Sequence, residues 1–284
     1  MTTVEEAEAP MLALAAIGAC TVQGRRPTNE DAETALASMH AELPDHALLA
    51  VFDGHGGALA AKIAERSLLA TLRLQPDYQT YQQQQADGRD PALLGAALRA
   101  AFLALDATIV LPELASADDS SGCTAIVVIV TPTHLVCASA GDSRACFCGP
   151  EAGVVALSQD HKPADPAETQ RIEAAGGCVV AGRVDGGLAV ARALGDPEYK
   201  KDLSWDGSPT GLLLPPEQQK VSPEPDVVVQ PRRASDQLVV VACDGKSTKA
   251  PFASETSEAR FEIARRDLGR DEQRALLRDA AQPA

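Results

Sequence analysis

Two apolar segments that each run into Asp-Gly constrain the fold of this chain more than any other feature. The first is "LLAVFDG", from Leu48 to Gly54, and the second is "LVVVACDG", from Leu238 to Gly245. Short apolar runs bounded by turn residues are typical of buried strands. The glycine after each aspartate allows a close backbone approach, so that a carbonyl oxygen can lie beside the carboxylate. The pattern predicts two buried strands that each present a carboxylate where the strand ends.

Further short segments rich in Val, Ala and Ile, flanked by turn residues, extend this pattern along the chain. Strands are expected at Leu14–Thr21, Leu48–Phe52, Ala125–Val130, Leu135–Ala140, Ala145–Cys148, Val179–Val180, Leu188–Ala191, Val227–Gln230 and Leu238–Cys243. Apolar residues at helical spacing and N-terminal Asp-Pro pairs predict helices at Ala58–Leu74, Pro91–Ile109 and Pro166–Ala175. Residues 76–90 and 200–220 are expected to be long loops. Helices grouped between runs of strands indicate an α+β layered fold.

Composition excludes several classes of function. The 284 residues fit one large domain or two small ones, and 45% hydrophobic with 23% charged residues is ordinary for a soluble globular protein. The net charge of -15, with no basic stripe, argues against nucleic-acid and anionic-membrane partners. Seven cysteines without a C-x-x-C pair indicate reduced thiols, and hence a cytoplasmic or nuclear location. The acidic N-terminus is unlike the basic start of a signal peptide. We expect the protein to be a monomer.

Acidic residues that follow predicted strands are the main chemical signal. They are Glu30 and Asp31 in "NED", Asp53, Asp142 in "AGDSR", and Asp244. Mg2+ and Mn2+ prefer carboxylate, carbonyl and water oxygens, and strand ends hold such ligands at one edge of a sheet. Any single Asp-Gly is more often only a turn. The joint occurrence favours a metal site.

The ordered motifs resemble those of the protein phosphatase 2C family of metal-dependent serine/threonine phosphatases. They are "QGRRPTNEDA", "LLAVFDGHGG", "SGCTAIVVIV", "LVCASAGDSRA", "LSQDHKP", "VSPEPDVVVQ" and "DQLVVVACDG", between Ile17 and Gly245. Cys123 and Ser139 depart from the residues common at their positions. The resemblance implies a four-layer α/β/β/α sandwich, in which two antiparallel sheets are flanked by helices. It also implies hydrolysis of phosphoserine and phosphothreonine in proteins, by attack of a water that bridges two metal ions.

The same resemblance implies roles for individual residues. Asp53 would bridge two Mn2+ or Mg2+ ions. Glu30 and the Gly54 carbonyl would complete one side and Asp244 would bind the other ion, while Asp31 would hold a metal-bound water. Asp142 would lie near a third, weaker ion, and Arg26 would hold the substrate phosphate.

The chemistry of the residues agrees with these roles. Two close ions activate water and neutralise phosphoryl charge, and Arg grips phosphate bidentately. His55, after Asp-Gly, is placed to protonate the leaving oxygen.

Several alternatives remain open from the sequence. Arg25 competes with Arg26 for the phosphate role. Asp142 either forms a turn and a salt bridge with Arg144 or takes part in metal binding. Asp196 in "ALGD" either supports the site or caps a turn. The alternative function is a catalytically weakened homologue that binds phosphoproteins or regulates a partner.

The resemblance ends at Gly245. The chain is therefore divided into an acidic tail (1–13), a catalytic domain (14–245) and a divergent Ala/Arg/Glu-rich tail (246–284). The chain has no Asp-Asn dipeptide to supply the family's last metal ligand, and Asp271 is the nearest substitute. We expect one metal site to lack a carboxylate, a sheet to lack a strand, and an amphipathic helix to form within Ser257–Ala280.

Overall fold

The computed structural model describes residues 16–150, 153–203, 209–233, 236–245 and 261–265. Its centre is a pair of five-stranded antiparallel sheets. The first sheet has the order β15-β7-β6-β3-β2, with β2 Ala32–Leu36, β3 Ala47–Phe52, β6 Ala125–Val130, β7 His134–Ala140 and β15 Asp226–Pro231. The second has the order β1-β17-β16-β8-β9, with β1 Ala16–Cys20, β17 Phe261–Arg265, β16 Leu238–Ala242, β8 Arg144–Gly149 and β9 Gly153–Ala156.

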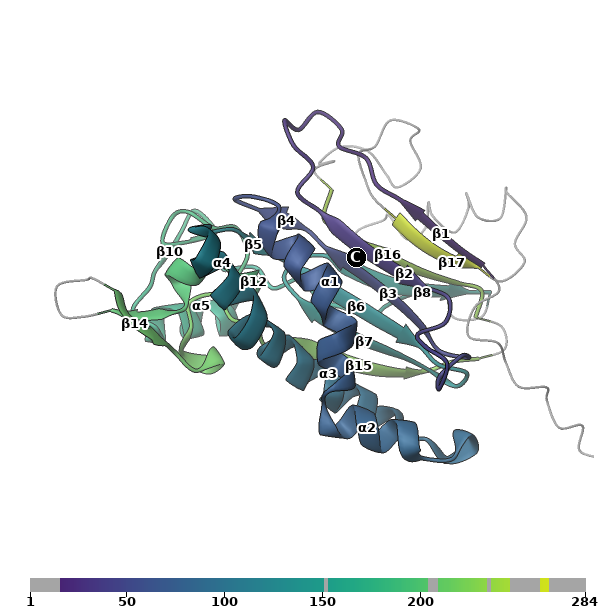
Figure 1. Ribbon diagram of the computed structural model, residues 1–284. Helices are drawn as coiled ribbons and strands as arrows, with labels where there is room; N and C mark the ends of the chain where they lie inside the picture. The colour runs from purple at the N-terminus through teal and green to yellow at the C-terminus, as the bar shows by residue number, and fades with distance from the viewer. Residues whose placement is uncertain (1–15, 151–152, 204–208, 234–235, 246–260, 266–284) are drawn as a thin grey trace, which may run out of the picture.

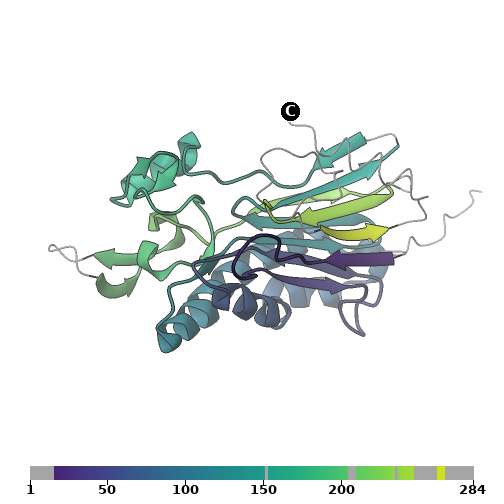
Figure 2. The ribbon, with the colours of Figure 1, turned by 90° about the horizontal axis from the view of Figure 1, so that it is seen from above.

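The two sheets pack face to face, as Figure 2 shows from above. Alternate residues of the strands point into the space between the sheets. The buried side chains that meet there include Val51, Ile126, Val128, Phe147 and Val241. The other face of the first sheet carries a second apolar cluster against the helices. Because both faces of the sheet are covered at its centre, the central strands β3 and β6 are apolar and buried along their whole length.

Helices cover the outer face of the first sheet (Figure 1). They are α1 Leu59–Arg73, α2 Pro76–Gln83, α3 Pro91–Leu105, the π-helical turn η2 Asp106–Val110 and α4 Leu111–Ala117. The apolar stripe of α1, formed by Ala60, Ala64, Leu68 and Leu72 at helical spacing, is buried. The run Pro91–Ala117 is long and apolar enough to cross a membrane, but it packs on the sheet as a core helix.

The α+β class with two antiparallel sheets is confirmed, and the described residues show three of the four expected layers. The remaining elements form a module beyond the sheet ends (Figure 1). They are α5 Pro166–Ala174, β10 Val179–Val180, β11 Arg183–Val184, η3 Pro197–Tyr199, β13 Lys201–Leu203, β14 Pro209–Leu213 and η4 Pro216–Gln218. Three two-residue strands, β4 Gly54–His55, β5 Gly122–Cys123 and β12 Leu194–Gly195, join it to the sandwich.

Some expected loops are ordered elements. Residues 76–90 contain α2 and the short turn η1 Ala86–Gly88. Tyr78 and Tyr81 of α2 are buried, and they hydrogen-bond to His40 and His46 respectively. Because these partners lie far away in the chain, the local sequence shows no indication of a helix here. Residues 200–220 contain β13, β14 and η4, so the second loop prediction was also wrong.

The strand predictions also differ from the structure in places. The expected strand at Leu188–Ala191 is absent, and Leu188 forms only an isolated bridge with Val184. Conversely, β2 and β9 were not predicted, because they lie at sheet edges and lack a continuous apolar run.

The tail differs from expectation where the structure describes it. Phe261–Arg265 forms β17, which pairs antiparallel with both β16 and β1. The second sheet therefore does not lack a strand between these two, and these five residues are not helical. The rest of the expected helix, Asp271 and residues 1–13 lie outside the described residues.

Candidate active site

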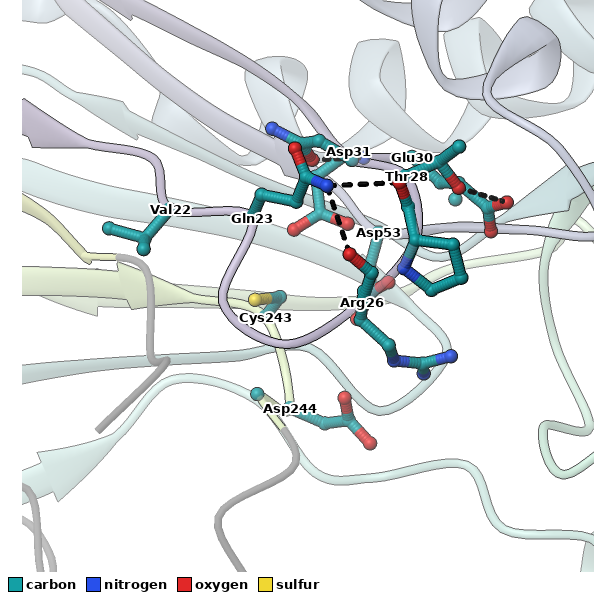
Figure 3. A pocket seen from close by; sticks show the side chains of 13 residues that line it. Val22, Gln23, Arg26, Thr28, Glu30, Asp31, Asp53, Cys243 and Asp244 are labelled. Carbon is teal, nitrogen blue, oxygen red and sulfur yellow. Dashed lines mark hydrogen bonds between the residues drawn. The ribbon is translucent and has the colours of Figure 1, made fainter. Parts of the chain in front are cut away.

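A pocket forms where the loop between β1 and β2 meets the ends of β3 and β16. It is lined by Val22, Gln23, Arg26, Pro27, Thr28, Asn29, Glu30, Asp31, Asp53, Gly54, Cys243, Asp244 and Gly245. Figure 3 shows the labelled side chains around this one space. The structure thus brings together Arg26 and five of the six residues expected near metal ions, from three separate parts of the chain.

Local hydrogen bonds shape the loop that carries Arg26. The Gln23 side-chain amide donates to the carbonyl oxygens of Arg26 and Pro27, at 2.9 and 3.0 Å. The backbone N–H of Asp31 donates to the side-chain oxygen of Asn29 at 3.1 Å. These short-range contacts are ordinary turn chemistry. They hold the guanidinium-bearing residue and Asp31 on the same loop at the pocket.

Asp53 is the electrostatic centre of the pocket. Burial, followed by the charges of Asp31, Asp244 and Asp142 and a hydrogen bond with Asp31, raises its pKa from 3.8 to about 8. Like charges that crowd around a buried carboxyl disfavour its ionised form. The site therefore has a surplus of negative charge that a bound cation would compensate.

Backbone contact joins the two acidic motifs. A side chain at Gly54 would place its Cβ 2.1 Å from the carbonyl oxygen of Glu30. Only glycine allows this approach. The sequence predicted that the glycine after Asp53 allows a carbonyl oxygen to approach closely, and in the structure that oxygen belongs to Glu30.

Asp142 follows β7 and does not line the pocket, although its charge acts on Asp53. It is buried and forms an ion pair with Lys162 of "DHKP". Burial raises the pKa of Asp142, with a further contribution from the charge of Asp244, although Lys162 opposes this rise. Arg144 pairs instead with Asp160, through contacts of 2.8 and 3.0 Å. The alternative of an Asp142–Arg144 ion pair was therefore wrong.

His55 does not line the pocket and pairs with a residue left unassigned from the sequence. Its Nε2 lies 2.9 Å from both carboxylate oxygens of Asp196. Burial alone would lower the pKa of His55, but the hydrogen bond and charge of Asp196, with the charges of Asp142 and Glu30, raise it. The only signal for Asp196 in the sequence was its Gly-Asp context in "ALGD".

Comparison with known proteins places this geometry in a family. Residues 15–246 match the family described as Protein phosphatase 2C. The chain belongs to the protein phosphatase 2C family. It is 38% identical over 232 residues to Protein phosphatase 1B of Mus musculus, covering 80% of this chain and 56% of the relative. It is 42% identical over 229 residues to Probable protein phosphatase 1N of Homo sapiens, covering 80% and 48% respectively. The chain thus spans about half the length of these curated relatives.

Solved structures support the same fold. The serine-threonine phosphatase 2C of Toxoplasma gondii superposes with a TM-score of 0.69 at 21% identity, covering 84% of this chain and 81% of that one. A phosphatase from a pathogenic strain of Toxoplasma gondii gives 0.62 at 29% identity, covering 81% and 76%. The family predicted from the motifs is confirmed.

The residues of this phosphatase 2C chain fit the divalent ions on which the family depends. The donors are carboxylates and a carbonyl, which suit Mg2+ and Mn2+. Across the described ranges, no group of three or more His, Cys, Asp or Glu side chains is arranged to hold an ion. Mg2+ commonly keeps several waters and takes one or two carboxylates. The carboxylate and carbonyl oxygens at the pocket are therefore donors of the kind that Mg2+ takes together with water.

Cys123, which departs from the phosphatase 2C pattern, is fully buried in β5. Burial raises the pKa of its thiol well above the ordinary value, and the charges of Asp196 and Asp106 add to this effect. A thiol of this kind is a poor nucleophile.

Gly54 offers a direct test of the metal site expected from the sequence. We expect Gly54→Ala to weaken Mn2+ binding about 10- to 100-fold, because the added methyl group must push Glu30 or Gly54 away from its place. Isothermal titration with Mn2+ measures this change. Gly88→Ala is the matched control, since nothing lies within 4 Å of a Cβ at Gly88. Equal affinity in wild type and Gly54→Ala would contradict the assignment of this contact to the metal site.

Proposed function

We propose that this chain is a metal-dependent protein serine/threonine phosphatase. The observation that carries the proposal is the meeting of Arg26 with Glu30, Asp31, Asp53 and Asp244 in one pocket. Carboxylates attract cations, and a guanidinium beside them attracts an oxyanion. A phosphate monoester bound with divalent ions satisfies both requirements. The relatives named as protein phosphatases support phosphorylated proteins as the substrate class.

We assign the ligands as follows. Asp53 would contact both of two Mn2+ or Mg2+ ions, with Glu30 and the Gly54 carbonyl on one side and Asp244 on the other. Asp31 would hold a coordinated water, and Asp142 would serve a third ion in competition with Lys162. When bound, the ions supply an activated water and neutralise charge on the phosphoryl group.

The protein's own groups perform the remaining tasks. Arg26 holds two phosphoryl oxygens, which fixes the orientation of the phosphorus atom. His55 donates a proton to the departing serine or threonine oxygen, because an alkoxide is too basic to leave unprotonated. The carboxylates would bind divalent cations, and these cations, together with Arg26, would supply the positive potential at the site. An acidic protein can therefore attract a phosphorylated substrate.

The decisive experiment measures hydrolysis of a phosphothreonine peptide with Mn2+ and after chelation. We expect turnover with Mn2+ and none after EDTA. A folded protein that binds the peptide but does not hydrolyse it in saturating Mn2+ would instead support the alternative of a phosphoprotein-binding homologue. A monomer in a reducing intracellular compartment, without nucleic-acid or membrane partners, stays a prediction.

Arg26 and Arg25 can be separated by substitution. We expect Arg26→Ala to lower kcat/KM for the phosphopeptide by at least about 10- to 100-fold, because the loss of even one charge-assisted hydrogen bond costs about 1.5–3 kcal/mol. Arg26→Lys should recover little, since an ammonium cannot make the bidentate contact. Arg25→Ala is the control, because Arg25 does not line the pocket. A larger loss for Arg25→Ala than for Arg26→Ala would reverse the assignment.

A further inference from the structure

A three-stranded sheet brings His55 and the "ALGD" segment to opposite sides of one glycine. In the order β12-β5-β4, Gly195 pairs with Gly122, and Gly122 pairs with His55. The backbone N–H of Asp196 donates to the Ser121 carbonyl at 3.1 Å. Asp196 and His55, 141 residues apart, are therefore neighbours through strand pairing.

Gly122 leaves the space in which the Asp196 carboxylate lies. A Cβ at Gly122 would be 2.2 Å from one carboxylate oxygen of Asp196. The carboxylate crosses this gap and places both oxygens 2.9 Å from His55 Nε2. It is 5% exposed, while the His55 side chain is 27% exposed. The Asp196 carboxylate is therefore buried against the histidine, while the His55 ring remains partly exposed to solvent.

A buried ion pair holds the turn that carries Asp196. Asp106, in the π-helical turn η2, accepts a hydrogen bond from the Gly195 N–H at 2.7 Å and one from Lys200 Nζ at 2.7 Å. Lys200 Nζ also donates to the Ala193 carbonyl at 2.8 Å. Gly195 and Asp196 both have positive φ, at 78° and 53°, which is uncommon for a non-glycine residue. Such conformations persist where the surroundings enforce them, often at functional sites.

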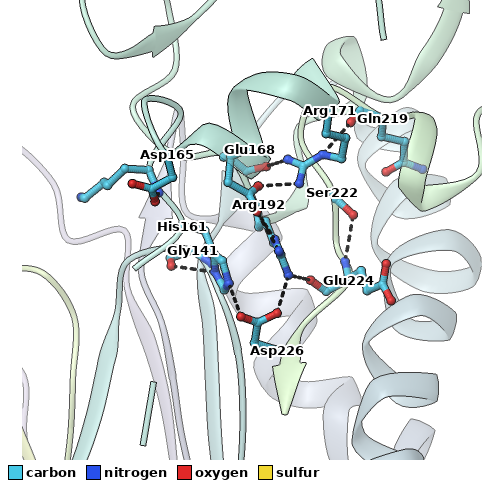
Figure 4. Close-up of polar contacts among 12 residues, drawn as sticks. Gly141, His161, Asp165, Glu168, Arg171, Arg192, Gln219, Ser222, Glu224 and Asp226 are labelled. Carbon is cyan, nitrogen blue, oxygen red and sulfur yellow. Dashed lines mark hydrogen bonds and ion pairs between the residues drawn. The ribbon is translucent and has the colours of Figure 1, made fainter. Parts of the chain in front are cut away.

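A second network fixes the same segment from the other side (Figure 4). Arg192 donates to Glu168 at 2.7 and 2.9 Å and to Asp226 at 2.9 Å. The backbone of Ala193 donates to the Ser222 carbonyl at 3.0 Å. Residues 192–196 are thus anchored to α5, to the start of β15 and to η2. A side chain at the end of such a segment has little freedom to move.

We propose that Asp196 is a positioning residue that orients His55 for proton donation to the leaving group. The inference rests on the proposed phosphatase function. The His55 Nε2–H donates to Asp196, and Nδ1 makes no hydrogen bond to any residue that the structure describes. The proton on Nδ1 passes to the substrate oxygen as the P–O bond breaks, and the bonding electrons remain on that oxygen. Asp196 stays a carboxylate throughout.

Leaving-group dependence distinguishes this role from a structural one. Proton donation matters greatly for a serine or threonine alkoxide and little for a nitrophenolate, which leaves unaided. We expect Asp196→Asn to lower kcat on a phosphothreonine peptide about 10- to 100-fold and kcat on a nitrophenyl phosphate less than about threefold, both in saturating Mn2+. His55→Gln should show the same selectivity. The double variant should lose no more than His55→Gln alone, because residues that act as one unit are not additive.

Asp45→Asn is the matched control. Its carboxylate pairs with His46 Nδ1 at 2.7 Å, away from the pocket, so both substrates should be hydrolysed at wild-type rates. Gly122→Ala gives a second, independent perturbation, since its methyl group would displace the Asp196 carboxylate, and it should show the same substrate selectivity. A Mn2+ titration of Asp196→Asn should match wild type.

Equal losses on both substrates, or additive losses in the double variant, would overturn the role of Asp196 and leave the phosphatase function standing. If Asp196→Asn does not fold, Gly122→Ala decides by the same criterion. A wild-type protein without Mn2+-dependent hydrolysis of either substrate would instead overturn the proposed function, and the inference with it.

Discussion

Replacing Asp53 with Asn is expected to abolish Mn2+-dependent hydrolysis while making the metal-free protein more stable at pH 8. Removing a residue that only hydrogen-bonds to a metal ligand typically lowers activity about 10- to 100-fold. The loss at Asp53 should be larger, because Asp53 is assigned as a direct ligand of both ions. Stability should rise because the substitution removes a buried charge from a crowd of carboxylates. Function and stability oppose each other at this position, as is common in active sites.

The raised pKa of Asp53 determines how the stability of the metal-free protein changes with pH. Burial and the charges of Asp31, Asp244 and Asp142 raise the folded-state pKa of Asp53 from 3.8 to about 8. Between these values the folded state binds more protons than the unfolded state, so the contribution of Asp53 to stability falls as the pH rises through this window. One pKa unit corresponds to about 1.4 kcal/mol, so we expect Asp53→Asn to gain more than about 1 kcal/mol at pH 8.

Thermal melts in EDTA at pH 4 and pH 8 measure this gain, which should be small at the lower pH. Adding Mn2+ should raise the Tm of wild type, because an ion that binds only the folded state stabilises it, and should leave the variant unchanged. Asp87→Asn, on an exposed turn, is the matched control. A lower Tm for metal-free Asp53→Asn at pH 8 would contradict the electrostatic account.

The second large effect is expected at the buried Asp106–Lys200 pair. The two side chains are 1% and 0% exposed, with a 2.7 Å contact. Burial raises the pKa of Asp106, although Lys200 and the Gly195 N–H oppose this rise. Asp106→Leu leaves the ammonium of Lys200 buried with the Ala193 carbonyl and no carboxylate. We expect a loss of about 3–5 kcal/mol in the free energy of unfolding, measured by urea denaturation.

A double variant separates the charge from the packing. Asp106→Leu with Lys200→Met removes both charges, so it should recover much of the lost stability. It should remain about 1–3 kcal/mol below wild type, because the Gly195 N–H loses its acceptor. Arg66→Ala, at an exposed pair with Glu113, is the control and should cost less than about 1 kcal/mol. Equal losses in the single and double variants would show that packing, and not the unpaired charge, dominates.

The parts of the fold and site that the sequence predicted are those with a local signature. The strands ending at Asp53 and Asp244, the buried stripe of α1 and the family itself follow from short motifs and from the spacing of apolar residues. The prediction failed where a segment is shaped by distant partners. The α2 helix appears polar along the chain, but Tyr78 and Tyr81 find His40 and His46 in the folded protein.

The sequence by itself grouped Glu30, Asp31, Asp53 and Asp244 at one site, because each lies in a recognisable turn at the end of a strand or in the loop before one. It left Arg25 and Arg26 as alternatives, and the structure places Arg26 at the pocket. Only the tertiary structure decided that Lys162 neutralises Asp142, that Phe261–Arg265 completes the second sheet, and that Asp196 meets His55. These contacts join residues far apart in the chain. They depend on strand register and on the space that Gly122 leaves empty, and neither is a property of any local stretch of sequence.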